Sequence, residues 1–229
     1  YKKPLPVSLW VGAFFNMKSC KSFMVNQYME EVVSQEDIQT RIEQLGAQIS
    51  RDYAGKKLIL MSVLSGAFMF AADLCRVIDG DVHIDFIRVS SYGSSTSSSG
   101  ALQFVQKPQL TLQGAHILIV EDIVDTGGTV QWLRDYFTSL EVESVRLCAL
   151  IDKKERRQVD VIVDYIGFAL DQGFLIGYGL DFAEKYRNLP ALYSLKEWAA
   201  RGIWLRIEGK LFWFVQYNQV RRSHMKKKK

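Results

Sequence analysis

Residues 120–129 read VEDIVDTGGT and stand between two segments of contrasting pattern. Before them, His116–Val120 is a short apolar run of the kind that forms a buried strand. After them, Val130–Leu140 carries apolar and aromatic residues along one broad side of a helix. The stretch therefore predicts a buried strand, a polar turn that contains glycine, and a helix, in that order.

The predicted turn combines two acids with a loop of small residues. Glu121 and Asp122 follow the apolar run, where carboxylates are unfavourable unless they are solvated, paired or bound to a metal. They are candidates to hold ribose hydroxyls or a hydrated magnesium ion. The small loop residues are Thr126, Gly127, Gly128 and Thr129. Their hydroxyls, the close backbone approach that glycine allows and the free amides at a helix start favour binding of a phosphate. Next to acids that hold a sugar, such a site fits a ribose 5-phosphate. The alternative is a turn that only caps the helix.

Other periodic segments predict the rest of the fold. Ser34 begins a capping-box sequence, and apolar residues then recur at helical spacing to about Tyr53. A further helix is predicted over Ala67–Val77. The remaining predicted strands are Leu58–Leu64, Val82–Val89, Val145–Ile151, Val161–Gly167 and Phe174–Tyr178. Strands that alternate with helices indicate an α/β fold, in which helices flank both faces of a mostly parallel, twisted sheet.

Ligands of such sheets bind beyond the carboxyl ends of the strands. The turns after Leu64, Val89, Val120 and Ile151 are therefore the places to expect chemistry. Two other nucleotide-binding motifs are weak in this chain. The loop at residues 126–129 lacks the Lys-Ser/Thr ending of a P-loop, and the Gly-Tyr-Gly sequence at 177–179 lacks the third glycine of a dinucleotide fingerprint.

The basic charge of the chain is concentrated at its end. The formal net charge is +4, and six positive charges with no acid among them come from Arg221, Arg222 and residues 226–229. The rest of the chain therefore carries 4 − 6 = −2. A body so close to neutral argues against a polyanion-binding face, and we expect no nucleic-acid partner.

The cysteines, the histidines and the apolar runs bear on the compartment of the protein. The chain has three widely spaced cysteines and no CxxC pair, which favours a reducing, cytoplasmic location. Three scattered histidines favour structural or surface roles over a zinc site. No apolar run approaches the roughly 20 residues that span a bilayer, so no membrane partner is expected. Residues 1–15 faintly resemble a secretion signal, but they contain two prolines and no clear cleavage site.

Several motifs together resemble the hypoxanthine-guanine phosphoribosyltransferase family. VEDIVDTGGT looks like the family's phosphoribosyl pyrophosphate motif, and the similarity extends over about residues 28–195. Other matching segments, in order, are Val63–Ala67 (pyrophosphate loop), Ser91-Tyr92 (lid), Gly177–Asp181 and Tyr186–Pro190 (late motif). The resemblance implies a type I phosphoribosyltransferase fold with a small hood region and a mobile lid loop.

The resemblance implies specific roles at the phosphoribosyl site. Glu121 and Asp122 would bind the ribose and magnesium, with Asp181 as a further magnesium contact. The 5-phosphate would lie in the loop made of Asp125, Thr126, Gly127, Gly128 and Thr129. Asp125 also resembles the family's general base, which accepts a proton from the purine ring. An N-cap of the following helix is the alternative interpretation of Asp125.

Purine and pyrophosphate contacts are implied in the same way. Lys153 would donate to the 6-oxo group, although a solvated basic loop of Lys153 and its neighbours is the alternative. Phe174 would stack on the base, with ordinary core packing as the alternative. The remaining implied purine contacts are Leu175, through its backbone, and Asp181.

The implied pyrophosphate contacts are Leu64, Ser65, Gly66 and Arg187, with the Leu64-Ser65 peptide in the cis form. Ser91 and Tyr92 would belong to the lid, with a flexible linker as the alternative for the Ser-rich stretch after them.

The resemblance predicts an enzyme of purine salvage. It would join hypoxanthine, and also guanine, to phosphoribosyl pyrophosphate with Mg²⁺, and release pyrophosphate. A regulator with the same fold that senses phosphoribosyl pyrophosphate, and a xanthine-preferring enzyme, are the alternatives. The family suggests a homodimer or homotetramer. We expect a domain at 28–200, an N-terminal extension at 1–27, and a C-terminal extension at 201–229 with a hairpin within Ile203–Tyr217.

Overall fold

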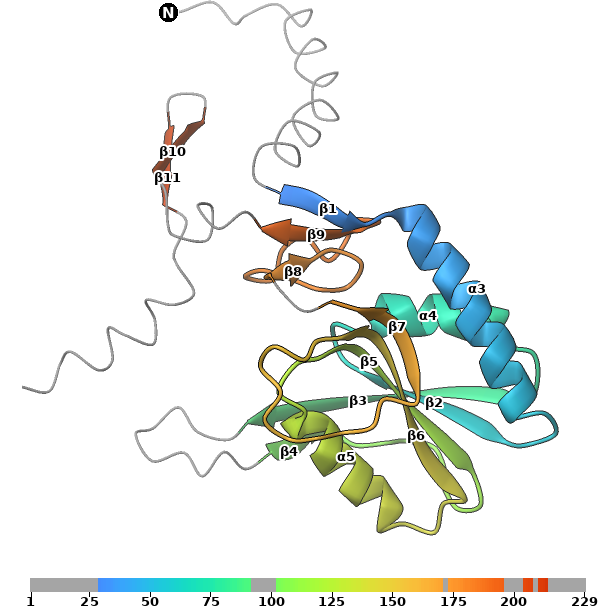
Figure 1. Cartoon of the computed structure of the whole chain (residues 1–229). Helices are drawn as coiled ribbons and strands as arrows, with labels where there is room; N and C mark the ends of the chain where they lie inside the picture. The colour runs from blue at the N-terminus through green and yellow to red at the C-terminus, as the bar shows by residue number, and fades with distance from the viewer. Residues whose placement is uncertain (1–28, 92–101, 171–172, 196–203, 208–209, 214–229) are drawn as a thin grey trace, which may run out of the picture. The chain divides into compact units, whose positions relative to one another are not determined.

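The computed structural model describes residues 29–91, 102–170, 173–195, 204–207 and 210–213 (Figure 1). The chain divides into two compact units, one from Val33 to Leu192 and the other made of the two ends of the chain. Each unit is considered by itself. In the part of the chain that the structure describes, no helix is both long and apolar enough to cross a membrane.

A six-stranded sheet with the order β4-β3-β2-β5-β6-β7 forms the centre of the larger unit. Its strands are β2 (Leu58–Val63), β3 (Val82–Ser91), β4 (Leu102–Gln106), β5 (His116–Val124), β6 (Ser144–Asp152) and β7 (Tyr165–Ala169). Neighbouring strands are parallel from β3 to β7, and only the edge strand β4 runs antiparallel. The predicted α/β class with a mostly parallel sheet is confirmed.

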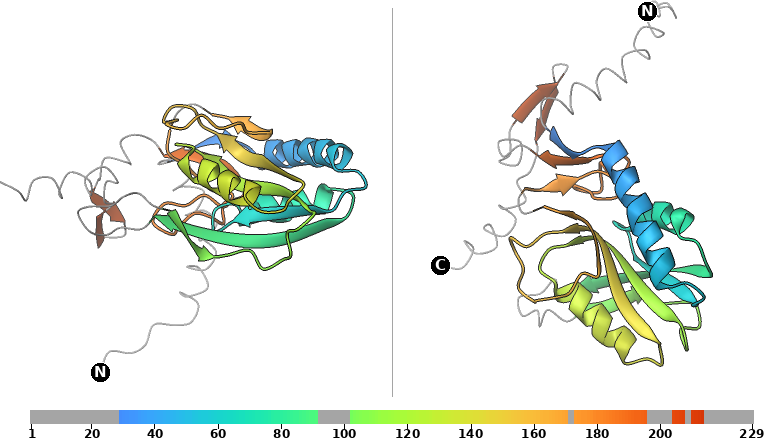
Figure 2. Two further views of the ribbon diagram at one scale, coloured as in Figure 1. Left: turned by 90° about the horizontal axis from the view of Figure 1, so that it is seen from below. Right: turned by 45° about the vertical axis from the view of Figure 1, so that its right-hand side comes forward.

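Helices cover both faces of this sheet (Figures 1 and 2). The helices are α3 (Gln35–Asp52), α4 (Phe68–Val77) and α5 (Gly128–Thr138). Leu58 and Leu60 of β2 pack with the helices α3 and α4, whereas Ile59 and Met61 pack with α5. Because side chains alternate across a strand and both faces are covered, β2 reads as a continuous apolar run.

The start of α3 follows the predicted capping sequence. The hydroxyl of Ser34 accepts a hydrogen bond from the backbone amide of Asp37 at 3.0 Å, which satisfies one amide of the first turn. The apolar positions of the helix, Ile38, Ile42, Leu45 and Ile49, are buried. The helix ends at Asp52, beside the expected Tyr53.

The strands β4, β5 and β7 of this sheet differ from the sequence prediction. β5 continues to Val124, so the two acids lie within the strand and not after it. β7 begins at Tyr165 instead of Val161, because Val161 is buried against the α5 cluster without pairing in the sheet. The strand β4 was not predicted: only alternate residues of it are partly buried, so it lacks a continuous apolar run.

Short strands make up the remaining structure. A three-stranded sheet has the order β1-β9-β8, formed by β1 (Met29–Val33), β8 (Leu175–Ile176) and β9 (Leu192–Leu195). β1 and β9 were not predicted. The strands β10 (Trp204–Ile207) and β11 (Lys210–Trp213) pair antiparallel, which confirms the expected hairpin.

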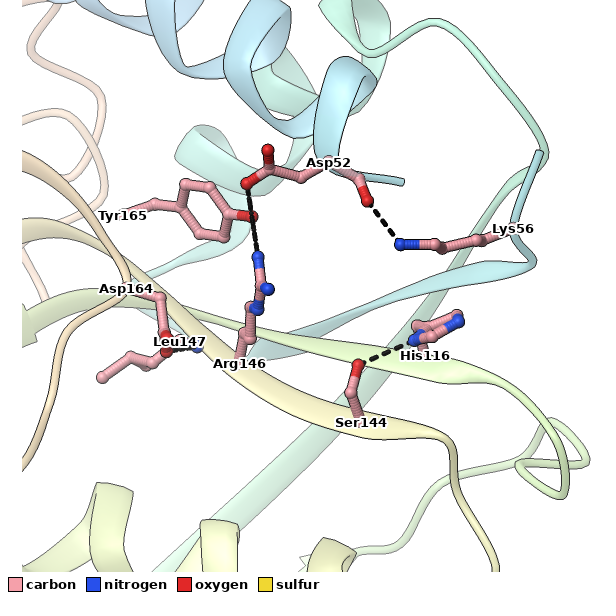
Figure 3. A network of polar contacts seen from close by, with 8 residues as sticks. All are labelled: Asp52, Lys56, His116, Ser144, Arg146, Leu147, Asp164 and Tyr165. Atoms are coloured by element: carbon pink, nitrogen blue, oxygen red, sulfur yellow. Dashed lines mark hydrogen bonds and ion pairs between the residues drawn. The ribbon is translucent and has the colours of Figure 1, made fainter. Parts of the chain in front are cut away.

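A polar network joins α3 to β6 and β7 (Figure 3). Arg146 and the hydroxyl of Tyr165 both donate to the carboxylate of Asp52, at 3.2 and 2.6 Å. His116, at the start of β5, lies 2.7 Å from the hydroxyl of Ser144 at the start of β6. The network therefore lies at the amino ends of these strands, and His116 has the structural role that its sequence context predicts.

Candidate active site

The carboxyl end of β5 and the start of α5 enclose a pocket of about 230 Å³. Its lining residues are Glu121, Asp122, Ile123, Val124, Asp125, Thr126, Gly127, Thr129 and Val130. Pockets for drug-sized ligands are on the order of 300–1,000 Å³, so this one suits a smaller group such as a sugar phosphate. Of the predicted loop residues, Gly128 begins α5 and is not part of the lining.

Glu121 of β5 is buried and Asp122 is partly buried, and neither forms an ion pair among the described residues. Burial, and then the charge of Asp122, raises the pKa of Glu121 well above its ordinary value. Burial also raises the pKa of Asp122 to about 6, although the positive charge of Arg187 acts in the opposite direction. Both carboxyls are therefore short of positive charge, which is the environment that a hydrated divalent cation relieves.

The predicted pyrophosphate loop lies against these acids. A side chain on Gly66 would place its Cβ only 1.6 Å from the Oδ2 atom of Asp122, so glycine is required there. The neighbouring Leu64-Ser65 peptide is cis, which confirms what the resemblance implies. A Cβ on Gly179 would lie 2.1 Å from the carbonyl oxygen of Gly66. The pyrophosphate loop, Asp122 and the late motif are thus in direct contact.

Asp125 has one paired and one unpaired carboxylate oxygen. Its Oδ2 atom is 3.2 Å from a guanidinium nitrogen of Arg156. Its Oδ1 atom is buried and has no hydrogen-bond partner among the described residues. A buried carboxylate oxygen without a partner is unfavourable, and it can accept a hydrogen bond or a proton from a donor that reaches it. The N-cap interpretation of Asp125 is wrong, because the N-cap of α5 is Gly127.

The loop before α5 has the features of a phosphate cradle. Gly127 adopts a left-handed conformation with φ at 85°, which glycine accepts without strain. The first turn of α5 contains no acidic residue and its N-cap makes no side-chain hydrogen bond. The first amides of a helix lack intrahelical partners and carry the positive end of the helix dipole. The loop therefore offers an anion several donors.

Lys153 is buried, and its ammonium group points to a neighbouring segment. It donates a hydrogen bond of 2.8 Å to the carbonyl of Gly173 and lies 3.2 Å from the carboxylate of Glu155. The solvated-loop interpretation is therefore wrong for Lys153, which is 8% exposed, and right for its neighbour Lys154, which is exposed. An ammonium has three donors, so a donor remains for a ligand.

Phe174 follows Gly173 directly and is 38% exposed. Its ring meets that of Phe182 edge to face, with centroids 5.5 Å apart. A ring with this exposure is not a core residue, so the core-packing interpretation is wrong. Leu175, by contrast, is buried in β8.

Asp181 and Arg187 form an ion pair. The guanidinium of Arg187 is 2.7 Å from Asp181 Oδ1 and also donates to the carbonyl of Gly179 at 2.7 Å. Asp181 Oδ2 accepts from the amide of Glu184. Within the described ranges, no three His, Cys, Asp or Glu side chains gather as a set of metal ligands. Any metal here would complete its shell with water and substrate oxygens, which is the usual habit of Mg²⁺.

Some of the predicted site is not placed, and some was missed. Ser91 ends β3, and Tyr92 with the Ser-rich stretch after it lies outside the described residues. Sequence reasoning missed the contacts of Arg156 and Arg157 with the Asp125 region. The basic run after Lys153 was the available signal, but charge alone does not tell which members reach inward.

Known proteins resemble this chain over most of its length. The family described as "Phosphoribosyl transferase domain" matches residues 29–183. Hypoxanthine-guanine phosphoribosyltransferase of Streptococcus pneumoniae is 44% identical over 172 residues, which cover 75% of this chain and 96% of the relative. The Bacillus subtilis enzyme of that name is 40% identical over 76% of this chain and 97% of its own. A crystal structure of a hypoxanthine phosphoribosyltransferase from Staphylococcus aureus superposes with a TM-score of 0.72 at 39% identity, covering 76% and 95% of the two chains.

Proposed function

The chain belongs to the hypoxanthine-guanine phosphoribosyltransferase family, and on that premise we propose that the pocket at the end of β5 is its active site. The protein is a purine salvage enzyme of the glycosyltransferase class, with phosphoribosyl pyrophosphate and a purine base as substrates. The relatives do not favour the regulator or the xanthine-preferring enzyme. The observation that carries the assignment is the unpaired Oδ1 atom of Asp125, a residue that lines one pocket with the loop before α5.

The 5-phosphate of the sugar donor binds the loop at residues 126–129. This assignment is supported by the free amides of the first α5 turn and the absence of an acid there. Thr126 and Thr129 line the same pocket, and their hydroxyls would supply further donors. The ribose then extends toward Glu121 and Asp122, which line the other part of the pocket.

Asp125 is the general base of the transfer. As one imidazole nitrogen of the purine attacks the anomeric carbon of the sugar, the other loses its proton to Asp125 Oδ1. Arg156 lies 3.2 Å from Oδ2, which leaves Oδ1 as the oxygen without a partner among the described residues. Proton transfer to a positioned carboxylate typically contributes about 10²–10⁴-fold to the rate.

Lys153 selects the base, and Phe174 stacks on it. The ammonium donates to the 6-oxo group of the purine while the carbonyl of Gly173 holds it in place. That hydrogen bond also joins Lys153 to the residue before Phe174. The contact of Lys153 with the edge of the base and the contact of Phe174 with its face are therefore positioned together. Leu175 and Asp181 adjoin the other edge of the purine.

Arg187 and the Leu64–Gly66 loop bind the pyrophosphate that leaves. A guanidinium suits phosphate oxygens, and Arg187 already lies in the field of Asp122. The resemblance favours Mg²⁺ as the divalent metal. Glu121, Asp122 and Asp181 would contact it partly through its water ligands, because no three such side chains gather as direct ligands among the described residues. A metal held by these residues would supply charge neutralisation for the leaving pyrophosphate.

We expect the reaction to depend on magnesium, since among the described residues no cation forms an ion pair with Glu121 or Asp122. Protein treated with a chelator should lose phosphoribosyl transfer to hypoxanthine, and added Mg²⁺ should restore it. Spectrophotometric detection of IMP measures the rate. Unchanged turnover in the presence of excess chelator would refute this metal assignment, and the purine reaction itself would still stand.

The domain boundary is a second proposal with a direct test. No residue of the site lies after Arg187, and the hairpin β10–β11 follows well beyond it. A protein that ends at Gly202 should therefore fold and keep the hypoxanthine reaction. Circular dichroism and the same assay check this, with the full chain as control. A folded but inactive truncation would show that the C-terminal segment contributes to the site.

The remaining proposals concern location and assembly. A cytoplasmic location is supported by the described cysteines, Cys75 and Cys148, which are both free. A homodimer or homotetramer, with no nucleic-acid or membrane partner, is the state that the family resemblance favours. Size-exclusion chromatography with light scattering measures the oligomeric state.

A further inference from the structure

The guanidinium of Arg157 donates hydrogen bonds to backbone carbonyls at two turns of the site. Its Nε atom donates to the carbonyl of Asp125 at 3.1 Å. One terminal nitrogen donates to the carbonyl of Val124 at 3.2 Å and to that of Lys153 at 3.3 Å. A single side chain therefore joins the backbone of the proposed base to the backbone of the proposed purine lysine.

A buried carboxylate holds this guanidinium in position. The same terminal nitrogen of Arg157 forms a hydrogen-bonded ion pair with Asp152, which is 3% exposed. Asp152 is the last residue of β6 and pairs with Val124 of β5. A buried ion pair with this many hydrogen bonds is rigid, and removal of one partner leaves the other charge uncompensated.

The backbone beside Arg157 holds the next part of the phosphate loop. The amides of Gln158 and Val159 both donate to the carbonyl of Thr126 at 3.0 Å. A Cβ on Gly127 would lie 2.4 Å from the carbonyl oxygen of Val159 and 3.2 Å from Cδ of Arg157. The phosphate loop therefore keeps these contacts when the guanidinium alone is changed, which separates the role of Arg157 from the binding of phosphate.

We infer that Arg157 is a positioning residue for the transfer reaction. It fixes the separation of the Asp125 carboxylate and the Lys153 ammonium, which act on two neighbouring positions of one purine edge, the imidazole nitrogen that loses its proton and the 6-oxo group. This inference rests on the proposed function. A misplacement of about 1 Å in such a constellation reduces the rate by as much as about 10²-fold. Lysine cannot replace the planar guanidinium of Arg157 and its several fixed donors, because the lysine ammonium is a single point charge.

The test compares Arg157→Lys with a matched variant, Arg41→Lys. Arg41 also donates to backbone carbonyls, those of Ile166 and Gly167, but these lie in β7 away from the site. In Arg157→Lys the kcat for hypoxanthine should fall roughly 10- to 100-fold, while the KM for phosphoribosyl pyrophosphate and the melting temperature stay close to wild type. Arg41→Lys should keep the wild-type kcat.

Chemical rescue distinguishes positioning from a general loss of structure. Added methylguanidine should raise the kcat of Arg157→Ala by about tenfold, because the small guanidinium occupies the vacated place. If Arg157→Ala does not fold, the double variant Asp152→Asn/Arg157→Ala is used in its place. The double variant also removes the charge of Asp152, which Arg157→Ala leaves unpaired.

A kcat of Arg157→Lys equal to that of Arg41→Lys would overturn the inference, and so would a folded Arg157→Ala variant that methylguanidine does not rescue. Wild-type protein that does not use hypoxanthine would instead refute the proposed function, and with it this inference.

Discussion

Hypoxanthine is expected to be used more efficiently than adenine by about 10⁴-fold or more in kcat/KM, the range seen when a site is built to hydrogen-bond one substrate group. The 6-oxo group accepts a hydrogen bond from Lys153, whereas the 6-amino group of adenine does not. Lys153 is buried, so an adenine in the site would leave an ammonium donor without a partner. Initial rates with each base, at saturating phosphoribosyl pyrophosphate, measure the ratio.

Two variants assign this preference to its residue. Lys153→Met keeps most of the length of the side chain but removes the ammonium, so the ratio of hypoxanthine to adenine efficiency should collapse. Lys154→Met removes the exposed lysine next to it and should leave the ratio unchanged. Adenine used as well as hypoxanthine by the wild type, or an intact ratio in Lys153→Met, would contradict the role of Lys153.

Asp125→Asn should slow the chemical step by about 10²–10⁴-fold, the usual contribution of a positioned base. The amide preserves size and hydrogen bonding but does not take the purine proton. Binding of phosphoribosyl pyrophosphate should change little, because the loop at residues 126–129 and the acids Glu121 and Asp122 are untouched. Rapid-quench measurement of the transfer step avoids masking by slow product release.

The control for this substitution is Asp135→Asn on the exposed side of α5, where the carboxylate accepts only from Gln131 among the described residues. It should transfer at the wild-type rate. If Asp125→Asn did so too, while Glu121→Gln or Asp122→Asn abolished transfer, the proton acceptor would have to be another group. Equal loss of donor affinity and of rate in Asp125→Asn would instead point to a collapsed loop.

The sequence alone determined those features that depend on local pattern. Continuous apolar runs predicted β2, β5 and β6, because strands covered on both faces bury every residue. The capping sequence at Ser34 and the glycines before α5 predicted helix starts, because caps and left-handed turns are decided within a few residues. The pocket at the end of β5 lies where those local signals meet.

Only the tertiary structure decided which side chains meet across the sheet. The pKa of Asp122 is raised because neighbouring segments bury it and Gly66 lies against it, and neither fact is written in the residues beside it. Lys153, Lys154 and Arg157 belong to one basic run of the sequence. Only the path of the chain after β6 turns Lys153 and Arg157 inward and leaves Lys154 exposed. Distances between turns of different strands are set by how the strands pair and what the helices cover, and a one-dimensional pattern does not contain them.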